Sequence, residues 1–280
     1  MRRSNEERLM GVHKPTPSED VPKMANPMDF VMPTEFITLP SQGKYPENHP
    51  LHGKDTLEIR YMTAKDEDIL TNRSLLKSGL ALDRLIQNLI VDKSIDHRSL
   101  LAGDRNAIMI HARASAYGSD YKTKVQCPAC GEISKFQFDL SDFETYYGDK
   151  IEEAEIIDNK DGTFSCTLPL SGIITKFKLL TGYDEIAIAQ ASTKNKKALE
   201  NDSITTQMKL CVIDFNGYND EKTINYCINN MLATDSKFLR GCLTLVTPDV
   251  IMQQDFTCRH CEHQEVVGVP FGTEFFWPDR

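Results

Sequence analysis

At 280 residues, the chain has room for about two domains, or for one domain with a large insertion. Its 32 Lys and Arg against 41 Asp and Glu leave a formal net charge of −9, which weighs against binding to a nucleic-acid backbone through clustered cations. A hydrophobic content of 40 % with 26 % charged residues is typical of a soluble folded protein. No apolar run approaches the ~18 residues of a membrane span. Residues 1–10 lack the apolar stretch of a secretory signal, so we expect a protein made in a cytoplasm.

The first third of the chain predicts an arm followed by strands and a helix. Residues 1–33 are charged, contain several prolines and show little periodicity, so they predict an extended arm that is either flexible or ordered against a partner. Residues 36–40 and 56–61 predict two short strands. Thr63 followed by Asp66 predicts a capping box at the start of a helix.

Helical periodicity continues up to the first cysteine pair. Apolar residues recur at helical spacing over 70–76, 80–91 and 99–116, and Gly79 marks a break between the first two. We therefore expect a mainly helical N-terminal region over residues 34–120.

Two cysteine pairs, Cys127 with Cys130 and Cys258 with Cys261, form C-x₂-C motifs. Two intervening residues let the chain turn so that both sulfurs face one point, and four thiolates suit tetrahedral Zn²⁺. Alternating residues lead into and out of each pair, which predicts that each motif is the tip of a β-hairpin. The two hairpins, within 121–139 and 250–270, would be the halves of a zinc ribbon.

The long segment between the pairs leaves alternatives open. Residues 131–257 exceed the ~15–20 residues that separate the pairs in a compact module, so a shared site requires an insertion that returns the chain to its start. We favour one shared structural Zn²⁺ over two half-sites, metal-free or bridging a dimer, and over a redox C-x-x-C. His260 and His263 could replace a thiolate, although four sulfurs suffice. The remaining cysteines are expected in the core: Cys166, Cys211, Cys227 and Cys242.

The predicted insertion, residues 140–249, mixes strands and helices. Its acidic segment 144–161 predicts a surface excursion, and residues 164–170 with 173–180 predict a hairpin. The charged stretch 194–200 predicts a solvated face. Apolar periodicity predicts helices over 184–191, 204–213, 221–232 and 236–245.

The C-terminal tail, residues 271–280, is rich in aromatic side chains. Such a concentration implies burial, either within the chain or as an anchor into a partner. The fold class we expect is thus α+β, with a helical N-terminal region, a β-rich zinc ribbon built from two distant hairpins, and a mixed insertion between them.

Catalytic motifs are missing from the sequence. It lacks a phosphate-binding G-x-x-x-x-G-K-[ST] loop, G-x-G-x-x-G, H-E-x-x-H and G-x-S-x-G. Four thiolates would also leave no open coordination position on the metal. We therefore expect no enzymatic activity, no catalytic residues and no bound cofactor other than structural Zn²⁺.

Several short stretches carry a resemblance to a known family. They are LPSQGK at 39–44, LEIR at 57–60, MTAKDE at 62–67, LAGDR at 101–105, SAYGSDY at 115–121, LLTG at 179–182, CRHC at 258–261 and FFWP at 275–278. Through them the chain resembles, over about residues 36–278, the baseplate hub and hub assembly proteins of T-even-type contractile-tailed bacteriophages.

This resemblance implies a non-enzymatic structural component of the baseplate hub, located in the virion tail and synthesised in the host cytoplasm. The implied partners are other hub, tube or wedge proteins in a symmetric assembly of several copies, with no nucleic acid and no membrane. One alternative is a transient hub assembly factor that is absent from the mature virion. A zinc-ribbon protein that binds nucleic acid is a second alternative, which the acidic balance opposes.

Overall fold

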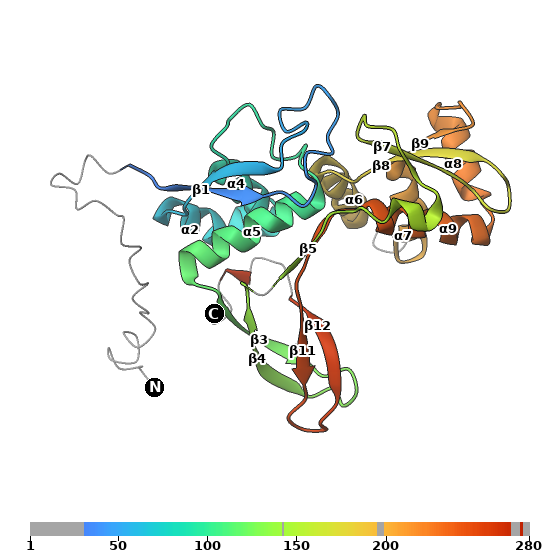
Figure 1. The fold of residues 1–280 in the computed structure, drawn as a ribbon. Helices are drawn as coiled ribbons and strands as arrows, with labels where there is room; N and C mark the ends of the chain where they lie inside the picture. Colours follow the sequence, from blue (N-terminus) through green and yellow to red (C-terminus); the bar gives the residue numbers. More distant parts are fainter. Residues whose placement is uncertain (1–30, 142, 195–198, 270–274, 277–280) are drawn as a thin grey trace, which may run out of the picture. The chain divides into compact units, whose positions relative to one another are not determined.

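The architecture is mixed α+β, as predicted. A computed structural model describes residues 31–141, 143–194, 199–269 and 275–276 (Figure 1). Contacts between Cα atoms divide the chain into two units, Met1–Pro33 and Thr34–Arg280. Within the described residues, eight α-helices are combined with several small antiparallel sheets. Residues 1–30 of the predicted arm lie outside the described residues.

The second unit begins with two paired strands. β1 (Thr34–Thr38) and β2 (Thr56–Arg60) are antiparallel, and the buried Ile37 lies opposite the buried Leu57. The two predicted strands are therefore confirmed, and their inner faces start the hydrophobic core.

Four helices follow, in agreement with the predicted helical region. They are α2 (Ala64–Thr71), α3 (Arg73–Ser78), α4 (Ala81–Leu89) and α5 (Ala102–Tyr117). At the start of α2 the Asp66 carboxylate accepts a hydrogen bond from the Thr63 N–H at 2.8 Å, which confirms the capping box. Gly79 ends α3 with φ +72°, a backbone conformation that favours glycine. None of the helices in the described parts of the chain is long and apolar enough to cross a bilayer.

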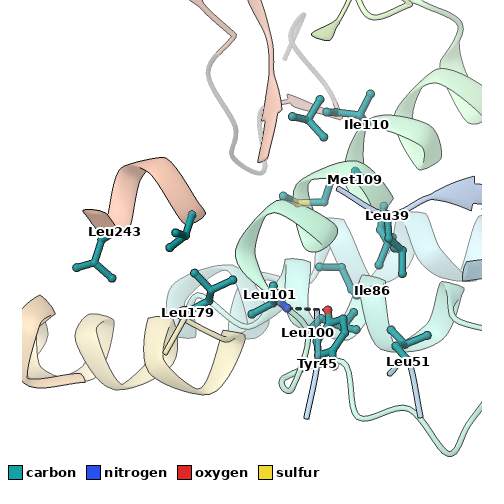
Figure 2. Close-up of a cluster of buried hydrophobic side chains, with 14 of the residues drawn as sticks. Leu39, Tyr45, Leu51, Ile86, Leu100, Leu101, Met109, Ile110, Leu179 and Leu243 are labelled. Atoms are coloured by element: carbon teal, nitrogen blue, oxygen red, sulfur yellow. Dashed lines mark hydrogen bonds between the residues drawn. The ribbon is translucent and has the colours of Figure 1, made fainter. Parts of the chain in front are cut away.

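Aliphatic side chains from these helices share one core with the turn after β1 (Figure 2). Leu39, Ile86 and Leu100 have no exposed surface. The Tyr45 hydroxyl reaches into the same core and accepts a hydrogen bond from the Leu101 N–H at 3.0 Å. The turn is therefore attached to the start of α5 by both apolar packing and a buried hydrogen bond.

A buried carboxylate strengthens this attachment. Asp104, in the first turn of α5, is fully buried and accepts hydrogen bonds from the Ser41 N–H at 2.9 Å and the Ser41 hydroxyl at 2.7 Å. The Tyr45 hydroxyl donates a third bond to it at 2.6 Å. Because a buried charge is tolerated only with such partners, these bonds fix the position of the turn on α5.

The chain enters and leaves the predicted insertion through two paired strands, which form a stem. β5 (Glu144–Tyr146) pairs antiparallel with β10 (Asp249–Ile251). At Gly148, φ is +63° and a Cβ atom would lie 2.2 Å from the Val246 carbonyl oxygen, so glycine is required where the two segments meet. The domain boundaries that the sequence predicts at 140 and 249 stay predictions.

Between the strands of this stem the chain forms a sheet and four helices. The sheet has the order β6 (Ile157–Asp158), β7 (Thr163–Thr167), β8 (Ile174–Lys178) and β9 (Val212–Phe215), all antiparallel. The helices are α6 (Gly182–Lys194), α7 (Leu199–Cys211), α8 (Glu221–Asn229) and α9 (Ala233–Val246), with a 3₁₀ turn η2 (Ile151–Ala154). The pairing of β7 with β8 confirms the predicted hairpin.

One helix prediction in this region is partly wrong. The helix expected over 204–213 ends at Cys211, and Val212 begins β9. Val212 pairs with Phe177 of β8 and is buried, so tertiary pairing overrides helical periodicity there. The acidic segment 144–161 also contains β5 and β6, which a simple surface excursion would lack. Residues 195–198 of the charged stretch lie outside the described residues.

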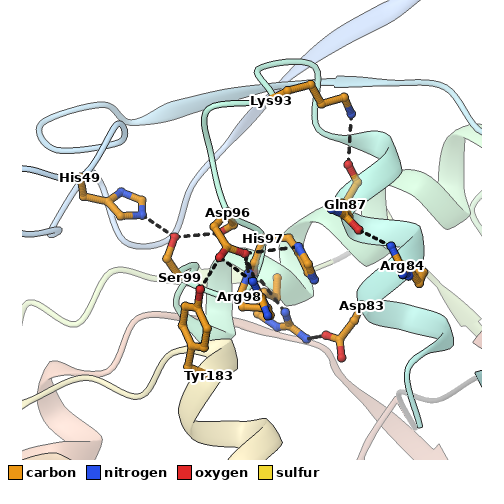
Figure 3. A network of polar contacts seen from close by, with 11 residues as sticks. His49, Asp83, Arg84, Gln87, Lys93, Asp96, His97, Arg98, Ser99 and Tyr183 are labelled. Carbon is orange, nitrogen blue, oxygen red and sulfur yellow. Dashed lines mark hydrogen bonds and ion pairs between the residues drawn. The ribbon is translucent and has the colours of Figure 1, made fainter. Parts of the chain in front are cut away.

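Polar and ionic contacts connect the start of α6, in the predicted insertion, to the helical region (Figure 3). The Tyr183 hydroxyl in α6 donates a short hydrogen bond to the Asp96 carboxylate. Arg105 of α5 contacts Asp83 of α4 at 2.6 Å and Glu185 of α6 at 3.3 Å. These contacts orient the start of α6 against the helical region.

The described part of the aromatic tail is buried within the chain. Phe275 and Phe276 are each 1 % exposed, and the Phe275 ring lies 5.0 Å from the ring of Tyr121. Burial of the tail is thus confirmed for these two residues. Trp277 lies outside the described residues, and anchoring into a partner stays a prediction.

Candidate metal centre

Two β-hairpins carry the cysteine pairs. β3 (Asp120–Gln126) pairs with β4 (Ile133–Asp139), and β11 (Gln253–Thr257) pairs with β12 (Gln264–Gly268). Figure 1 shows the two hairpins side by side, although residues 131–257 separate their cysteines in the sequence. Each C-x₂-C motif occupies a hairpin tip, as predicted. We refer to β3–β4 and β11–β12 together as the hairpin pair.

The two tips bring four sulfur atoms together. The Sγ atoms of Cys127, Cys130, Cys258 and Cys261 all lie within 4.8 Å of one another. The Cys127 and Cys261 sulfurs are 3.7 Å apart, as are those of Cys130 and Cys258. These distances exceed the ~2.05 Å of a disulfide bond, so the four residues are free thiols. Among the described residues, this is the only group of His, Cys, Asp and Glu side chains close enough to share a metal ion.

The backbone at the two tips follows the same plan. The Cys127 N–H donates to the Glu132 carbonyl at 2.8 Å, and the Gly131 N–H returns to the Cys127 carbonyl at 2.8 Å. In the second tip, the Cys258 N–H donates to the His263 carbonyl at 2.9 Å. Gly131 has φ +75°, and Glu262 has φ +56° in the equivalent turn. Both loops thereby turn their two sulfurs toward one point.

Packing between the hairpins is small but specific. The Phe136 ring meets the Phe256 ring edge-on at 5.6 Å between centroids, and Phe256 is 1 % exposed. The Gln254 side-chain amide also bridges the hairpins, because its oxygen accepts from the Asp139 N–H at 3.1 Å and its nitrogen donates to the Asp139 carbonyl at 2.7 Å. The two hairpins therefore contact each other along β4 and β11.

The thiols of Cys258 and Cys130 differ in acidity. Backbone N–H groups of His260 and Cys261 stabilise the thiolate of Cys258 and lower its pKa to about 6. At Cys130 the backbone at Glu132 favours the thiolate, but desolvation and the other three thiols outweigh it and raise the pKa to about 12. A thiolate therefore forms readily at Cys258, whereas the neighbouring thiols disfavour one at Cys130.

This donor set fits a soft divalent cation. Thiolates are preferred ligands of Zn²⁺, and four of them close its tetrahedral shell. Such an ion would be structural, because a closed shell has no position for substrate or water. Of the two histidines considered as replacements, His263 is directed to Glu265, whose carboxylate lies 3.4 Å from its Nε2.

The remaining cysteines largely agree with their predicted role. Cys166, Cys211 and Cys242 are buried in the core, and Cys227 is partly exposed. Sequence analysis did not identify the contact between Phe136 and Phe256, which holds the two hairpins together. The strand alternation indicates that Phe136 and Phe256 lie on the inner faces of their hairpins. It does not indicate that these two residues meet, because the long insertion separates them in the sequence.

A family model describes most of the chain. It matches residues 32–277, from the first strand to the aromatic tail, and covers both cysteine pairs. No curated protein and no solved structure matches the chain. Because the match extends over far more than half of the sequence, the chain belongs to the family described as T4 bacteriophage base plate protein.

Proposed function

We propose that this protein is a non-enzymatic structural component of the hub region of a contractile tail baseplate, where it joins neighbouring subunits. The observation that carries the proposal is the family match over residues 32–277. Membership in a baseplate family supports a structural role in the virion tail and contacts with other baseplate proteins. Assignment to the hub, rather than to tube or wedge, rests on the sequence resemblance.

The proposal includes one structural Zn²⁺ held by Cys127, Cys130, Cys258 and Cys261. Four thiols within 4.8 Å of one another, with few apolar contacts around them, support this assignment. Metal analysis of the purified chain tests it, with one Zn²⁺ per chain as the expected result. Absence of bound Zn²⁺ from protein purified without chelator would contradict a zinc site.

Quantitative mass spectrometry of purified mature phage particles tests the structural role. The expected result is this polypeptide at a fixed ratio to a baseplate protein of known copy number. Presence in lysates of infected cells together with absence from particles would contradict the proposal and would identify a transient assembly factor instead.

A further inference from the structure

The hairpin pair carries exposed cations that have no partner among the described residues. Lys122, Lys124, Lys135 and Arg259 are exposed, and no ion pair or hydrogen bond involves their side chains in the described parts of the structure. The chain as a whole is acidic, with a net charge of −9. What distinguishes these four side chains is their position, because they line two adjoining clefts of the hairpin pair.

Two of these cations are placed unfavourably for the hairpin alone. Lys124 of β3 lies directly opposite Lys135 of β4. At the two ends of this hairpin, the Leu140 N–H donates to the Ser119 carbonyl and the Cys127 N–H donates to the Glu132 carbonyl. Because hydrogen-bonded and non-hydrogen-bonded pairs alternate along antiparallel strands, Lys124 and Lys135 form a non-hydrogen-bonded pair. Side chains in such pairs lie close together, and like charges there destabilise a hairpin. An anionic partner would relieve this repulsion.

The same alternation exposes an unpaired strand edge. The backbone N–H and C=O groups of Lys135 and Gln137 point away from β3, toward β11. On β11, the alternation set by the Cys258 to His263 hydrogen bond directs the backbone of Asp255 and Thr257 away from β12. The two edges are not paired with each other, since β4 and β11 belong to separate sheets.

A cleft separates the two edges. It has a volume of about 360 Å³ and is lined by residues 134–137, 255–257 and Arg259. A second cleft of about 270 Å³ adjoins it along Lys135 and Arg259 and adds Lys122 and Lys124 to the lining. Together the two clefts carry four cations and one carboxylate, that of Asp255.

One residue that lines this cleft has a buried polar atom without a partner among the described residues. Ser134 lines it and is only 7 % exposed, and its hydroxyl has no hydrogen-bond partner among the described residues. A buried hydroxyl without a partner is unfavourable, and native structures seldom retain one without a reason. A bound polar backbone would supply the missing partner.

From these observations we propose that the cleft between β4 and β11 binds an extended acidic segment of another polypeptide as an added β-strand. The unpaired edges supply main-chain hydrogen bonds, and the lysines with Arg259 supply charge complementarity. Four extended residues span about 13 Å, which matches the length of strand 134–137 at the cleft. The proposal concerns this surface alone and does not depend on the place of the protein in the baseplate.

A direct binding measurement tests this surface with the full-length chain, purified without chelator. The probe is a fluorescein-labelled eight-residue peptide of alternating Glu and Val, followed by fluorescence anisotropy. A matched peptide of alternating Glu and Pro has the same charge but cannot donate main-chain hydrogen bonds from proline. We expect the first peptide to bind and the second to bind at least about tenfold more weakly.

Lys124→Glu separates binding from folding. This substitution places a carboxylate opposite Lys135 in place of a second lysine, so thermal stability should stay the same or rise. Peptide affinity should fall about tenfold, because the cleft loses a cation and gains an anion. Lys222→Glu on α8 makes the same charge change at another exposed lysine and should alter affinity by less than about twofold. Equal binding of both peptides, or an unchanged affinity in Lys124→Glu, would overturn the proposal. Tighter binding of a single-stranded oligonucleotide, lost in Lys124→Glu, would also overturn it and indicate a nucleic-acid partner.

Discussion

The helical region at 34–117 and the hairpin pair are stabilised in different ways. In the helical region, side chains such as Leu85, Ile86 and Leu89 are 0 % exposed and belong to one continuous core. The hairpin pair has only a small cluster of its own, in which Cys127, Phe256 and Cys258 are the buried members. Apolar burial holds the first together and also includes Tyr121 and Phe138 at the base of the first hairpin, whereas the hairpin tips bury little apolar surface beyond their small cluster.

This difference shows how one chain combines two means of stabilisation. Small structures that bury little apolar surface depend on disulfides or metals, and metal binding then contributes directly to folding. The four thiols lie at the tips of hairpins that meet mainly through Phe136 and Gln254, which is where the proposed Zn²⁺ would add a cross-link. The comparison leads to four predictions, ordered by expected effect.

Removal of the metal should have the largest effect, confined to the hairpin pair. Structural Zn²⁺ sites in small domains have apparent binding free energies of about 10–16 kcal/mol, so chelation should open the two hairpins. In hydrogen exchange read by mass spectrometry, amides of β3, β4, β11 and β12 should lose protection. Amides of α4 and α5 should keep theirs. Equal loss of protection in both regions would contradict the comparison.

Substitution of the cysteines should show that the two pairs act as one unit. Cys127→Ser and Cys258→Ser should each remove most of the contribution of the metal, and the double variant should be no less stable than either single variant. Urea unfolding measures these free energies. Cys227→Ser, a partly buried thiol outside the cluster, is the control and should cost about 1 kcal/mol or less. Additive losses would indicate two independent sites.

A cavity in the helical core should destabilise the protein whether or not metal is bound. Leu85→Ala removes a fully buried side chain, and such truncations cost about 2–5 kcal/mol. The loss should be the same with and without chelator, because the core does not involve the thiols. Leu76→Ala, at a residue 37 % exposed, should cost about 1 kcal/mol or less. A loss for Leu85→Ala that appears only with chelator would break the comparison.

The smallest effect concerns acid stability at the start of α2. Burial raises the pKa of Asp66, but hydrogen bonds from Arg60 and Thr63 outweigh it, so the pKa is lowered in the folded protein. This carboxylate therefore adds stability above its unfolded pKa of about 3.9, and the contribution is lost as pH falls through the folded value.

Asp66→Asn should accordingly cost about 1–3 kcal/mol at neutral pH and show a shallower loss of stability in acid than the wild type. Unfolding measured from pH 7 to about pH 2, which extends below the usual pKa of a carboxylate, gives both quantities. The control is Asp68→Asn, an exposed neighbour that should have an effect within about 0.5 kcal/mol. If Asp66→Asn and the wild type lost stability equally steeply in acid, protonation of Asp66 would be excluded as a cause of that loss.

Local signals made the hairpins, the capping box and the N-terminal helices predictable. Strand alternation around Cys127 and Cys258 needs only neighbouring residues to be recognised, and so does the Thr63 to Asp66 spacing. The two-pair pattern also justified expecting the cysteines in one cluster, since the chemistry of Zn²⁺ demands four ligands.

Features that depend on distant pairing were not predictable. The strands β5 and β10 are only three residues long, which is too short for an alternating pattern to be detected. The start of β9 has the apolar spacing of the preceding helix, and only the pairing of Val212 with Phe177 shows that it is a strand. Asp104 resembles an ordinary residue in the first turn of a helix, and its role becomes visible only when Ser41 and Tyr45 lie beside it. The cleft beside β4 likewise depends on how two separate hairpins meet.

The order in which the chain is synthesised gives the split cysteine cluster a consequence in time. Cys127 and Cys130 leave the ribosome before residues 131–257 have been made, and translation at about 5–20 residues per second takes roughly ten seconds to reach Cys258. During that time the first hairpin carries two of the four clustered thiols, and the helical region still lacks the part of its core that later residues such as Leu179 and Leu243 supply. The four thiols can come together only after the intervening segment has been made and has brought Cys258 and Cys261 back to the first hairpin.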